Sequence, residues 1–274
     1  MRGTSSTSFA EVLRQAEAAF AGVAESSGSL ESEAQELFSV ADAIDSSNQL
    51  VRTLSDPGRP AEVKEATVRT LLSSRVSPQS LDKTLEVVRR RWSEQEDILD
   101  ALELLGVSAL LEQAQSEGVL EQVEGELFEV SRMIDDSGEL TAALDGAREN
   151  PSQRATMLST LLDGRTHRLT AALAARAVGR RTELKPARRV EEFARFASDR
   201  RRRAFAAVSS AVPLNEAQQA RLGAVLSSIY GREVQMNLQV DPDVVGGLRI
   251  QVGDDLYDAT VLARLSRARS QLVA

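Results

Sequence analysis

The chain has 274 residues, of which 42% are hydrophobic and 27% are charged, and its net charge is −8. This composition is typical of a soluble folded protein with room for two or three domains, and it is too apolar for a wholly disordered chain. The lack of cysteine excludes disulfides and thiolate chemistry, and a single histidine, His167, excludes a histidine metal cluster within one chain.

Signals for targeting and for nucleotide binding are absent from the sequence. The longest stretch without a charged side chain, Ala204–Asn215, is far shorter than the roughly 20 residues of a membrane-spanning helix. The N-terminal segment lacks the apolar core of a secretory signal, which makes the cytosol the default compartment. No lysine follows a glycine, as a phosphate-binding loop requires, and no Gly-x-Gly occurs. We therefore expect no catalytic residues, no cofactor and no metal site.

From the N-terminus onward, the helical part contains an internal duplication. Residues 29–56 align with residues 119–146 at an offset of 90, with eleven identical positions among 28. In both copies a Glu-Leu-Phe motif is followed by a proline, Pro60 or Pro151, that precedes a helix. A period of 90 exceeds the roughly 20–50 residues of solenoid repeats, so the chain is predicted to hold two copies of one helical domain.

Each copy is predicted to consist of amphipathic helices. Ser77 is placed to cap a helix that starts at Pro78, and Asn150 is placed in the same way in the second copy. An apolar stripe at helical spacing follows the first of these caps, with Leu81, Leu85, Val88 and Trp92. We assign copy one to residues 1–98 and copy two to residues 99–202, and we expect the last helix of copy one to run into the first helix of copy two.

Beyond residue 202 the pattern changes to that of a small α/β domain, residues 203–274. A run compatible with a strand ends at Pro213, and Asn215 begins a helix with a glutamine placed as in a capping box. Apolar residues then alternate along Val234–Val240 and Leu248–Val252, which predicts two half-buried strands. The apolar side of a last predicted helix is formed by Val261, Leu265, Ala268 and Leu272. The predicted fold class is mainly α, with two tandem helical bundles followed by a small α/β domain.

Two adjacent glycines, Gly246 and Gly247, lie between the predicted strands. A phosphate cradle needs glycine N–H groups at the start of a helix, whereas this pair leads into a strand. Glycines in that position usually supply a positive φ, a bulge or a close approach of another backbone. We therefore predict a structural turn, to which we assign Asp241, Pro242, Gly246, Gly247 and Gly253.

The C-terminal third contains short motifs in a distinctive order: Ser210, Ala211, Pro213 and Leu214, then Asp241–Pro242, Gly246–Gly247 and Gly253–Asp254. In this order they resemble the delta subunits of F-type ATP synthases, the family of the mitochondrial oligomycin-sensitivity-conferring protein. One departure is Asp258–Ala259–Thr260, where the family more often has Asp-Gly-Ser. The helical part resembles the family's six-helix N-terminal domain more weakly, and it occurs twice here, as in delta subunits of actinobacterial type.

The resemblance implies a stator protein that catalyses nothing itself and joins the catalytic head to the peripheral stalk. The implied partners are the N-terminal segments of the alpha subunits, the b-type stalk subunit and, indirectly, the beta subunits. Contact with the membrane would occur only through the complex, at the cytoplasmic face of the bacterial plasma membrane.

The resemblance also suggests where the partners bind. Family members bind the alpha segment in a groove between their first and fifth helices. The matching residues here are Val12, Ala16, Phe20, Leu81, Leu85, Val88 and Trp92. The same residues are compatible with ordinary core positions, and the sequence leaves both interpretations open. For the b-type subunit we assign Leu248, Ile250 and Leu256, on the exposed side of the C-terminal domain.

An alternative function rests on the charge of residues 176–203, which include eleven basic and four acidic residues. Such a stretch can neutralise nucleic-acid phosphates. Few aromatic residues are available to stack on bases, and Phe193, Phe196 and Phe205 fit core positions better. A solvated helix face or a contact with acidic proteins explains such a stretch more often, so nucleic-acid binding is kept only as the alternative.

Overall fold

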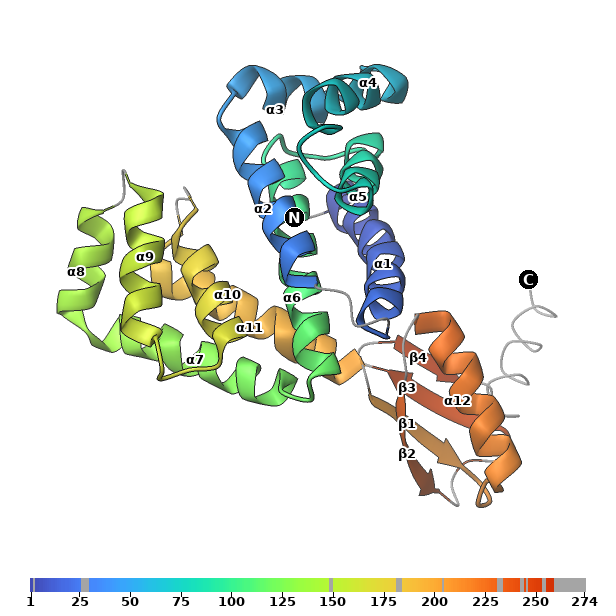
Figure 1. Ribbon diagram of the computed structural model, residues 1–274. Coiled ribbons are helices and arrows are strands. Elements are labelled where there is room, and N and C mark those ends of the chain that lie inside the picture. The colour runs from blue at the N-terminus through green and yellow to red at the C-terminus, as the bar shows by residue number, and fades with distance from the viewer. Residues whose placement is uncertain are drawn as a thin grey trace. The chain divides into compact units, whose positions relative to one another are not determined.

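The computed structural model describes residues 1, 3–25, 30–147, 150–180, 184–203, 205–230, 234–241, 244, 246–252 and 255–258. The chain divides into two compact units, Met1–Ala194 (unit one) and Arg195–Ala274 (unit two). Unit one is helical, whereas unit two contains a four-stranded sheet and a helix (Figure 1). The predicted fold class, mainly α with a small α/β part near the C-terminus, is confirmed.

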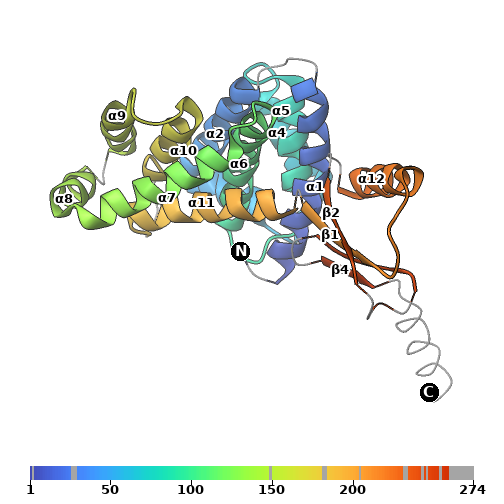
Figure 2. The same ribbon diagram turned by 90° about the horizontal axis from the view of Figure 1, so that it is seen from below.

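Unit one is a succession of helices. They are α1 (Thr4–Glu25), α2 (Leu30–Asp45), α3 (Asn48–Ser55), α4 (Ala61–Leu72), α5 (Pro78–Arg89), α6 (Asp97–Ser116), α7 (Leu120–Asp136), α8 (Gly138–Gly146), α9 (Pro151–Leu162), α10 (Arg168–Val178) and α11 (Pro186–Arg203). The division between the two units falls within α11. The first part of α11 lies beside α7, where the Ser131 hydroxyl donates a hydrogen bond of 3.0 Å to the Ala187 carbonyl (Figure 2).

The duplication found in the sequence is present in the structure, and the two copies share one helix. α4 and α9 begin and end 90 residues apart, and nearly the same offset relates α2 to α7, α3 to α8 and α5 to α10. It also relates α1 to α6, and α6 to α11. Helix α6 is therefore both the last helix of bundle one (α1–α6) and the first helix of bundle two (α6–α11). The boundary assigned between residues 98 and 99 lies in the first turn of this shared helix.

The composition of α6 explains how one helix serves two bundles. Its sequence, DILDALELLGVSALLEQAQS, has apolar residues around the whole helix instead of along one stripe, which is typical of a helix buried on all sides. Leu102, Leu105 and Leu111 are among its fully buried side chains. At Gly106 the Phe38 ring of α2 lies so close that an added Cβ would overlap it. The glycine thus allows α2 to approach α6 closely.

The glutamate of the Glu-Leu-Phe motif has the same role in both bundles. In bundle one the Glu36 carboxylate accepts hydrogen bonds from the backbone N–H of Ser77 at 2.9 Å and from its hydroxyl at 2.6 Å. In bundle two the Glu126 carboxylate accepts from the N–H of His167 at 2.8 Å and from the Thr170 hydroxyl at 2.5 Å. Ser77 and His167 are the N-caps of α5 and α10, so each glutamate fixes the start of a fifth helix.

Replacing Glu36 by glutamine is expected to lower the free energy of unfolding by about 1 kcal/mol at neutral pH, and by much less in acid. Burial alone would raise the pKa of Glu36, but hydrogen bonds from Ser77 and Ser80 outweigh it and hold the pKa below its ordinary value of 4.5. A lowered folded-state pKa stabilises the fold above the ordinary value, and this contribution is lost as the pH falls through the lowered one.

Urea unfolding of the wild type and the Glu36→Gln variant, at neutral pH and at about pH 3, measures this difference. Glu129→Gln, on the exposed side of α7, is the matched control, because it makes the same change at an exposed position of the surface. If the wild type and Glu36→Gln differed equally at both pH values, the Glu36 carboxylate would not be the group that titrates.

Unit two is built on a mixed sheet with the strand order β2-β1-β3-β4. Its elements are β1 (Phe205–Ser210), α12 (Glu216–Tyr230), β2 (Gln235–Val240), β3 (Leu248–Val252) and β4 (Asp255–Asp258). β1 pairs parallel with β2 and antiparallel with β3, and β3 pairs antiparallel with β4. Leu226 of α12 packs with Ala206, Val208 and Val252 on one face of the sheet. Although β2 and β3 follow one another in the sequence, β1 separates them in the sheet.

The predicted capping box at the start of α12 is confirmed. The N–H of Asn215 donates to Gln218 Oε1 at 3.0 Å, and the N–H of Gln218 donates to Asn215 Oδ1 at 2.9 Å.

The segment that follows β2 contains the residues assigned to the structural turn. The Asp241 N–H donates to the Ser210 carbonyl at 2.9 Å, and Gly246 and Gly247 have φ values of 66° and 84°. These φ values lie in the left-handed region, which a glycine adopts without strain. Pro242, Gly253 and the last predicted helix, which contains Val261, Leu265, Ala268 and Leu272, lie outside the described residues.

Candidate functional site

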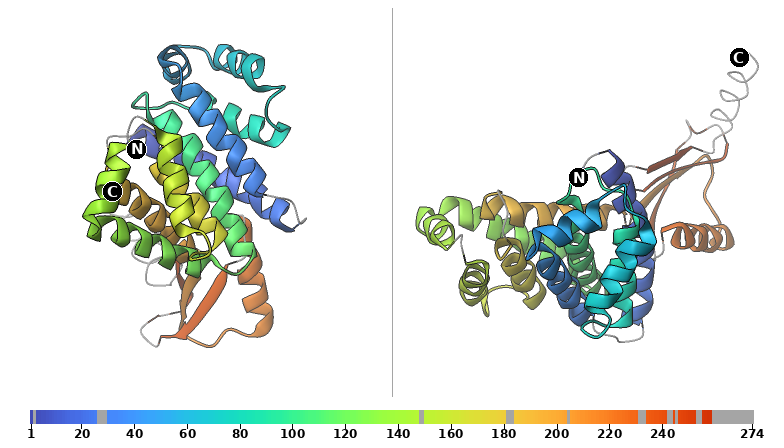
Figure 3. Two further views of the ribbon diagram at one scale, coloured as in Figure 1. Left: turned by 60° about the vertical axis from the view of Figure 1, so that its left-hand side comes forward. Right: turned by 90° about the horizontal axis from the view of Figure 1, so that it is seen from above.

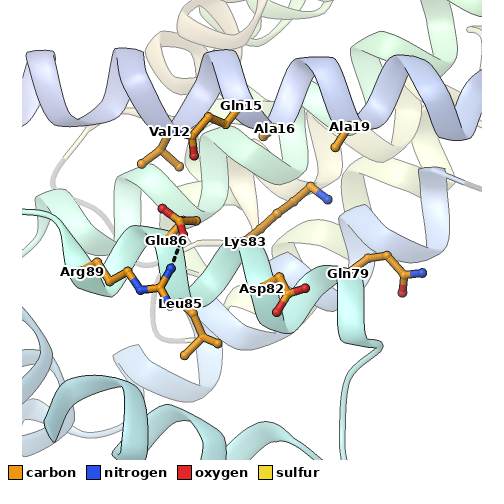
Figure 4. Close-up of a pocket in the computed structure, with 10 residues that line it drawn as sticks. All are labelled: Val12, Gln15, Ala16, Ala19, Gln79, Asp82, Lys83, Leu85, Glu86 and Arg89. Carbon is orange, nitrogen blue, oxygen red and sulfur yellow. Dashed lines mark hydrogen bonds and ion pairs between the residues drawn. The ribbon is translucent and has the colours of Figure 1, made fainter. Parts of the chain in front are cut away.

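A groove of about 430 Å³ lies between α1 and α5 of bundle one (Figure 4). Its lining residues are Val12, Gln15, Ala16 and Ala19 from α1 and Gln79, Asp82, Lys83, Leu85, Glu86 and Arg89 from α5. Val12, Ala16 and Leu85 are buried and form an apolar floor, whereas most of the others are at least partly exposed and polar. An apolar floor with a polar rim suits an amphipathic helix laid along the groove.

The seven residues matched to the family's alpha-binding groove all lie in bundle one. All are core residues, at most 9% exposed. Val12, Ala16 and Leu85 also line the groove. The remaining four, Phe20, Leu81, Val88 and Trp92, are packed inside the bundle.

Sequence reasoning missed the polar rim of the groove. Gln15 and Ala19 each follow a floor residue by three positions, and Asp82 and Arg89 lie within one turn of the floor residue Leu85. Residues three or four positions apart are neighbours on a helix surface, so this spacing was the available signal.

Ion pairs with neighbouring helices hold Lys83 and Arg89, the two basic side chains of the rim. Lys83 Nζ is 2.6 Å from Glu33 Oε1 of α2, and it lies 4.7 Å from the centre of the Phe20 ring. Arg89 Nε is 2.5 Å from Glu65 Oε1 of α4, and this hydrogen bond is the main cause that lowers the pKa of Glu65 below its ordinary value. Because neighbouring helices fix these charges, the groove is better suited to binding than to proton transfer.

Three arginines of residues 176–203 are paired inside bundle two. The fully buried Glu103 of α6 accepts hydrogen bonds from Arg176 Nε at 3.0 Å, from Arg180 Nη1 at 2.8 Å and from Arg189 Nη2. Their additional carboxylate partners are, in the same order, Asp42, Asp100 and Glu192. These three charges are neutralised within the fold and do not contribute to a surface for phosphates, so the pairing does not favour the nucleic-acid alternative.

The three residues assigned to the b-type contact do not share one face of the sheet. Leu248 and Ile250 pack against the core that contains α12. Leu256 pairs with Gln251 and is 59% exposed, and since Gln251 follows Ile250 in β3, Leu256 lies on the other face.

No helix in the described part of the chain has the length and apolarity needed to cross a membrane. Across the same residues, no group of three or more His, Asp or Glu side chains could hold a metal ion.

Comparison with known proteins places these features in one family. The family model described as "ATP synthase delta (OSCP) subunit" matches residues 107–272. The protein named ATP synthase subunit delta from Beutenbergia cavernae is 39% identical to this chain, and the aligned region covers 99% of each of the two chains. Proteins of the same name from Thermobifida fusca and Streptomyces coelicolor are 36% and 37% identical and also cover at least 99% of both chains. The chain therefore belongs to the family of ATP synthase delta (OSCP) subunits.

Proposed function

We propose that this chain is a non-catalytic peripheral-stalk subunit of an F-type ATP synthase, at the cytoplasmic face of the plasma membrane. It joins the catalytic alpha/beta head to the b-type stalk subunit, so that rotor torque drives ATP synthesis instead of turning the head. The observation that carries this proposal is the similarity to proteins named ATP synthase subunit delta over 99% or more of the chain.

The α1–α5 groove is the proposed site for the N-terminal segment of an alpha subunit. Its apolar floor can receive anchors at positions i, i+3 or i+4 and i+7 of an amphipathic helix. The small side chains of Ala16 and Ala19 leave room for large apolar anchors, which dominate the binding energy of such contacts. A stator must dissociate slowly under torque, and nanomolar affinity corresponds to about 12 kcal/mol.

We assign the contact with the b-type subunit to unit two, centred on Leu256. This side chain is 59% exposed, whereas Leu248 and Ile250 pack against the hydrophobic core. A large exposed apolar side chain suits a contact with the apolar side of a stalk helix.

Purification of the ATP synthase in mild detergent, through a tag on this chain, tests the proposal. The alpha, beta and b subunits are expected to copurify. The Leu256→Asp variant should retain alpha and beta but lose most of the b subunit, because an aspartate in the contact would be desolvated without a partner. Val212→Asp, at another exposed apolar residue of unit two, is the control. Recovery of a complete, coupled complex without this chain would contradict the proposed function.

A further inference from the structure

Bundle two contains a counterpart of the α1–α5 groove, between α6 and α10. The offset of 90 relates Gln15 and Ala19 of α1 to Leu105 and Ala109 of α6. Gln15 and Ala19 are exposed, but Leu105 and Ala109 are fully buried. The counterpart groove is therefore already covered in the folded chain.

Helix α2 of bundle one covers the counterpart groove. The Phe38 ring of α2 lies against Gly106, which is the counterpart of Ala16 on the floor of the open groove. The Arg176 guanidinium of α10 lies over the same ring, 4.7 Å from its centre, and Arg176 Nη1 is 2.8 Å from Asp42 Oδ2 of α2. Both walls of the counterpart groove, α6 and α10, thus contact α2 (Figure 3).

The contact extends along most of α2. Glu31, in its first turn, pairs with Arg168 at the start of α10, and Asp42, near its end, pairs with Arg176. These two acids are 11 positions apart. At 1.5 Å per residue they span about 16 Å of helix. α2 therefore lies on bundle two as a helical ligand lies in a groove, although it belongs to the same chain.

α2 is a permanent part of bundle one. Leu30, Ala34 and Leu37 are completely buried, and α2 packs more extensively against α6 than against any other described helix. Because α6 also belongs to bundle one, a partner helix that replaced α2 on α6 would have to break the packing of bundle one. A partner helix therefore cannot compete for the place that α2 occupies.

We infer that bundle two receives no partner helix, because α2 occupies its groove, and that the two bundles together bind a single helix, in the α1–α5 groove of bundle one. The identification of this helix as an alpha-subunit segment rests on the proposed function. The counterpart groove of bundle two then serves as the contact surface between the two bundles.

Isothermal titration of the full-length chain with a synthetic peptide of the alpha N-terminal segment tests the inference. The expected stoichiometry is one peptide per chain. Ala19→Arg places a long charged side chain at an exposed position in the open groove. This variant should bind the peptide at least about 30-fold more weakly, and the titration should reveal no second site. Ala142→Arg makes the same change on the exposed surface of α8 in bundle two and should bind as the wild type does.

The possible outcomes separate the inference from the proposed function. Two peptides per chain, or one peptide bound to Ala19→Arg with wild-type affinity, would overturn the inference and leave the alpha contact standing. If the peptide did not bind the wild-type chain, both the inference and the proposed alpha contact would be wrong. If circular dichroism showed that Ala19→Arg does not fold, Asp82→Arg, at an exposed residue on the α5 side of the groove, would take its place.

Discussion

Replacing Glu103 by glutamine is expected to lower the free energy of unfolding by about 3–5 kcal/mol. The Glu103 side chain is fully buried in α6 and accepts hydrogen bonds from three arginines, Arg176, Arg180 and Arg189. Glutamine keeps the shape of the side chain but removes its charge, so the arginines would remain buried with too little opposite charge. Chemical denaturation followed by circular dichroism measures the loss.

A matched control separates this effect from the loss of any carboxylate. Glu129→Gln, on the exposed side of α7, is expected to change stability by less than about 0.5 kcal/mol. Added salt should change the effect of Glu103→Gln little, because buried pairs are screened less than exposed ones. A loss below about 1 kcal/mol would mean that the additional partners Asp42, Asp100 and Glu192 suffice to hold the arginines.

The Glu103 cluster is a property of the joint between the bundles and not of the bundle fold. In bundle one the corresponding position is Leu13, which is also buried. The cluster connects α6, α10 and α11, and through the pair of Arg176 with Asp42 it reaches α2. The cluster therefore stabilises the same surface of bundle two that α2 covers.

The positions of the helices could be predicted from the sequence because the signals are local. Ser77 and Asn150, predicted as N-caps, each accept a hydrogen bond from the backbone N–H three residues later. The duplication gave a second, independent measure of where each helix begins, since α4 and α9 start 90 residues apart. Capping and periodicity depend on neighbours within a turn or two, which the sequence displays directly.

Contacts between distant residues could not be predicted in this way. The carboxylates that pair with Arg176 are 73 and 134 residues away in the sequence, so its charge was counted as part of a basic stretch. In unit two, the face on which Leu256 lies depends on its register with β3. In bundle one, apolar periodicity identified the buried side of α5, and the family resemblance that of α1, but neither identified the polar residues that border the groove.

Membrane vesicles that carry the Ala19→Arg chain are expected to lose most ATP-driven proton pumping while they retain ATP hydrolysis. Ala19 is an exposed residue of the α1–α5 groove, where the proposed function places an apolar anchor of the alpha segment. An arginine there would have to be desolvated without a partner, or it would keep the anchor out, and losing one such anchor weakens binding at least about 30-fold.

A head that is no longer held by the stator turns with the rotor, so hydrolysis continues without moving protons. Quenching of an acridine dye reports the pumping, and phosphate release in the same vesicles reports the hydrolysis. Ala142→Arg, on the exposed surface of α8, should leave both unchanged, because it makes the same substitution outside the α1–α5 groove. If Ala19→Arg vesicles with normal amounts of this chain pumped protons as the wild type does, a contact other than the α1–α5 groove would have to resist the torque.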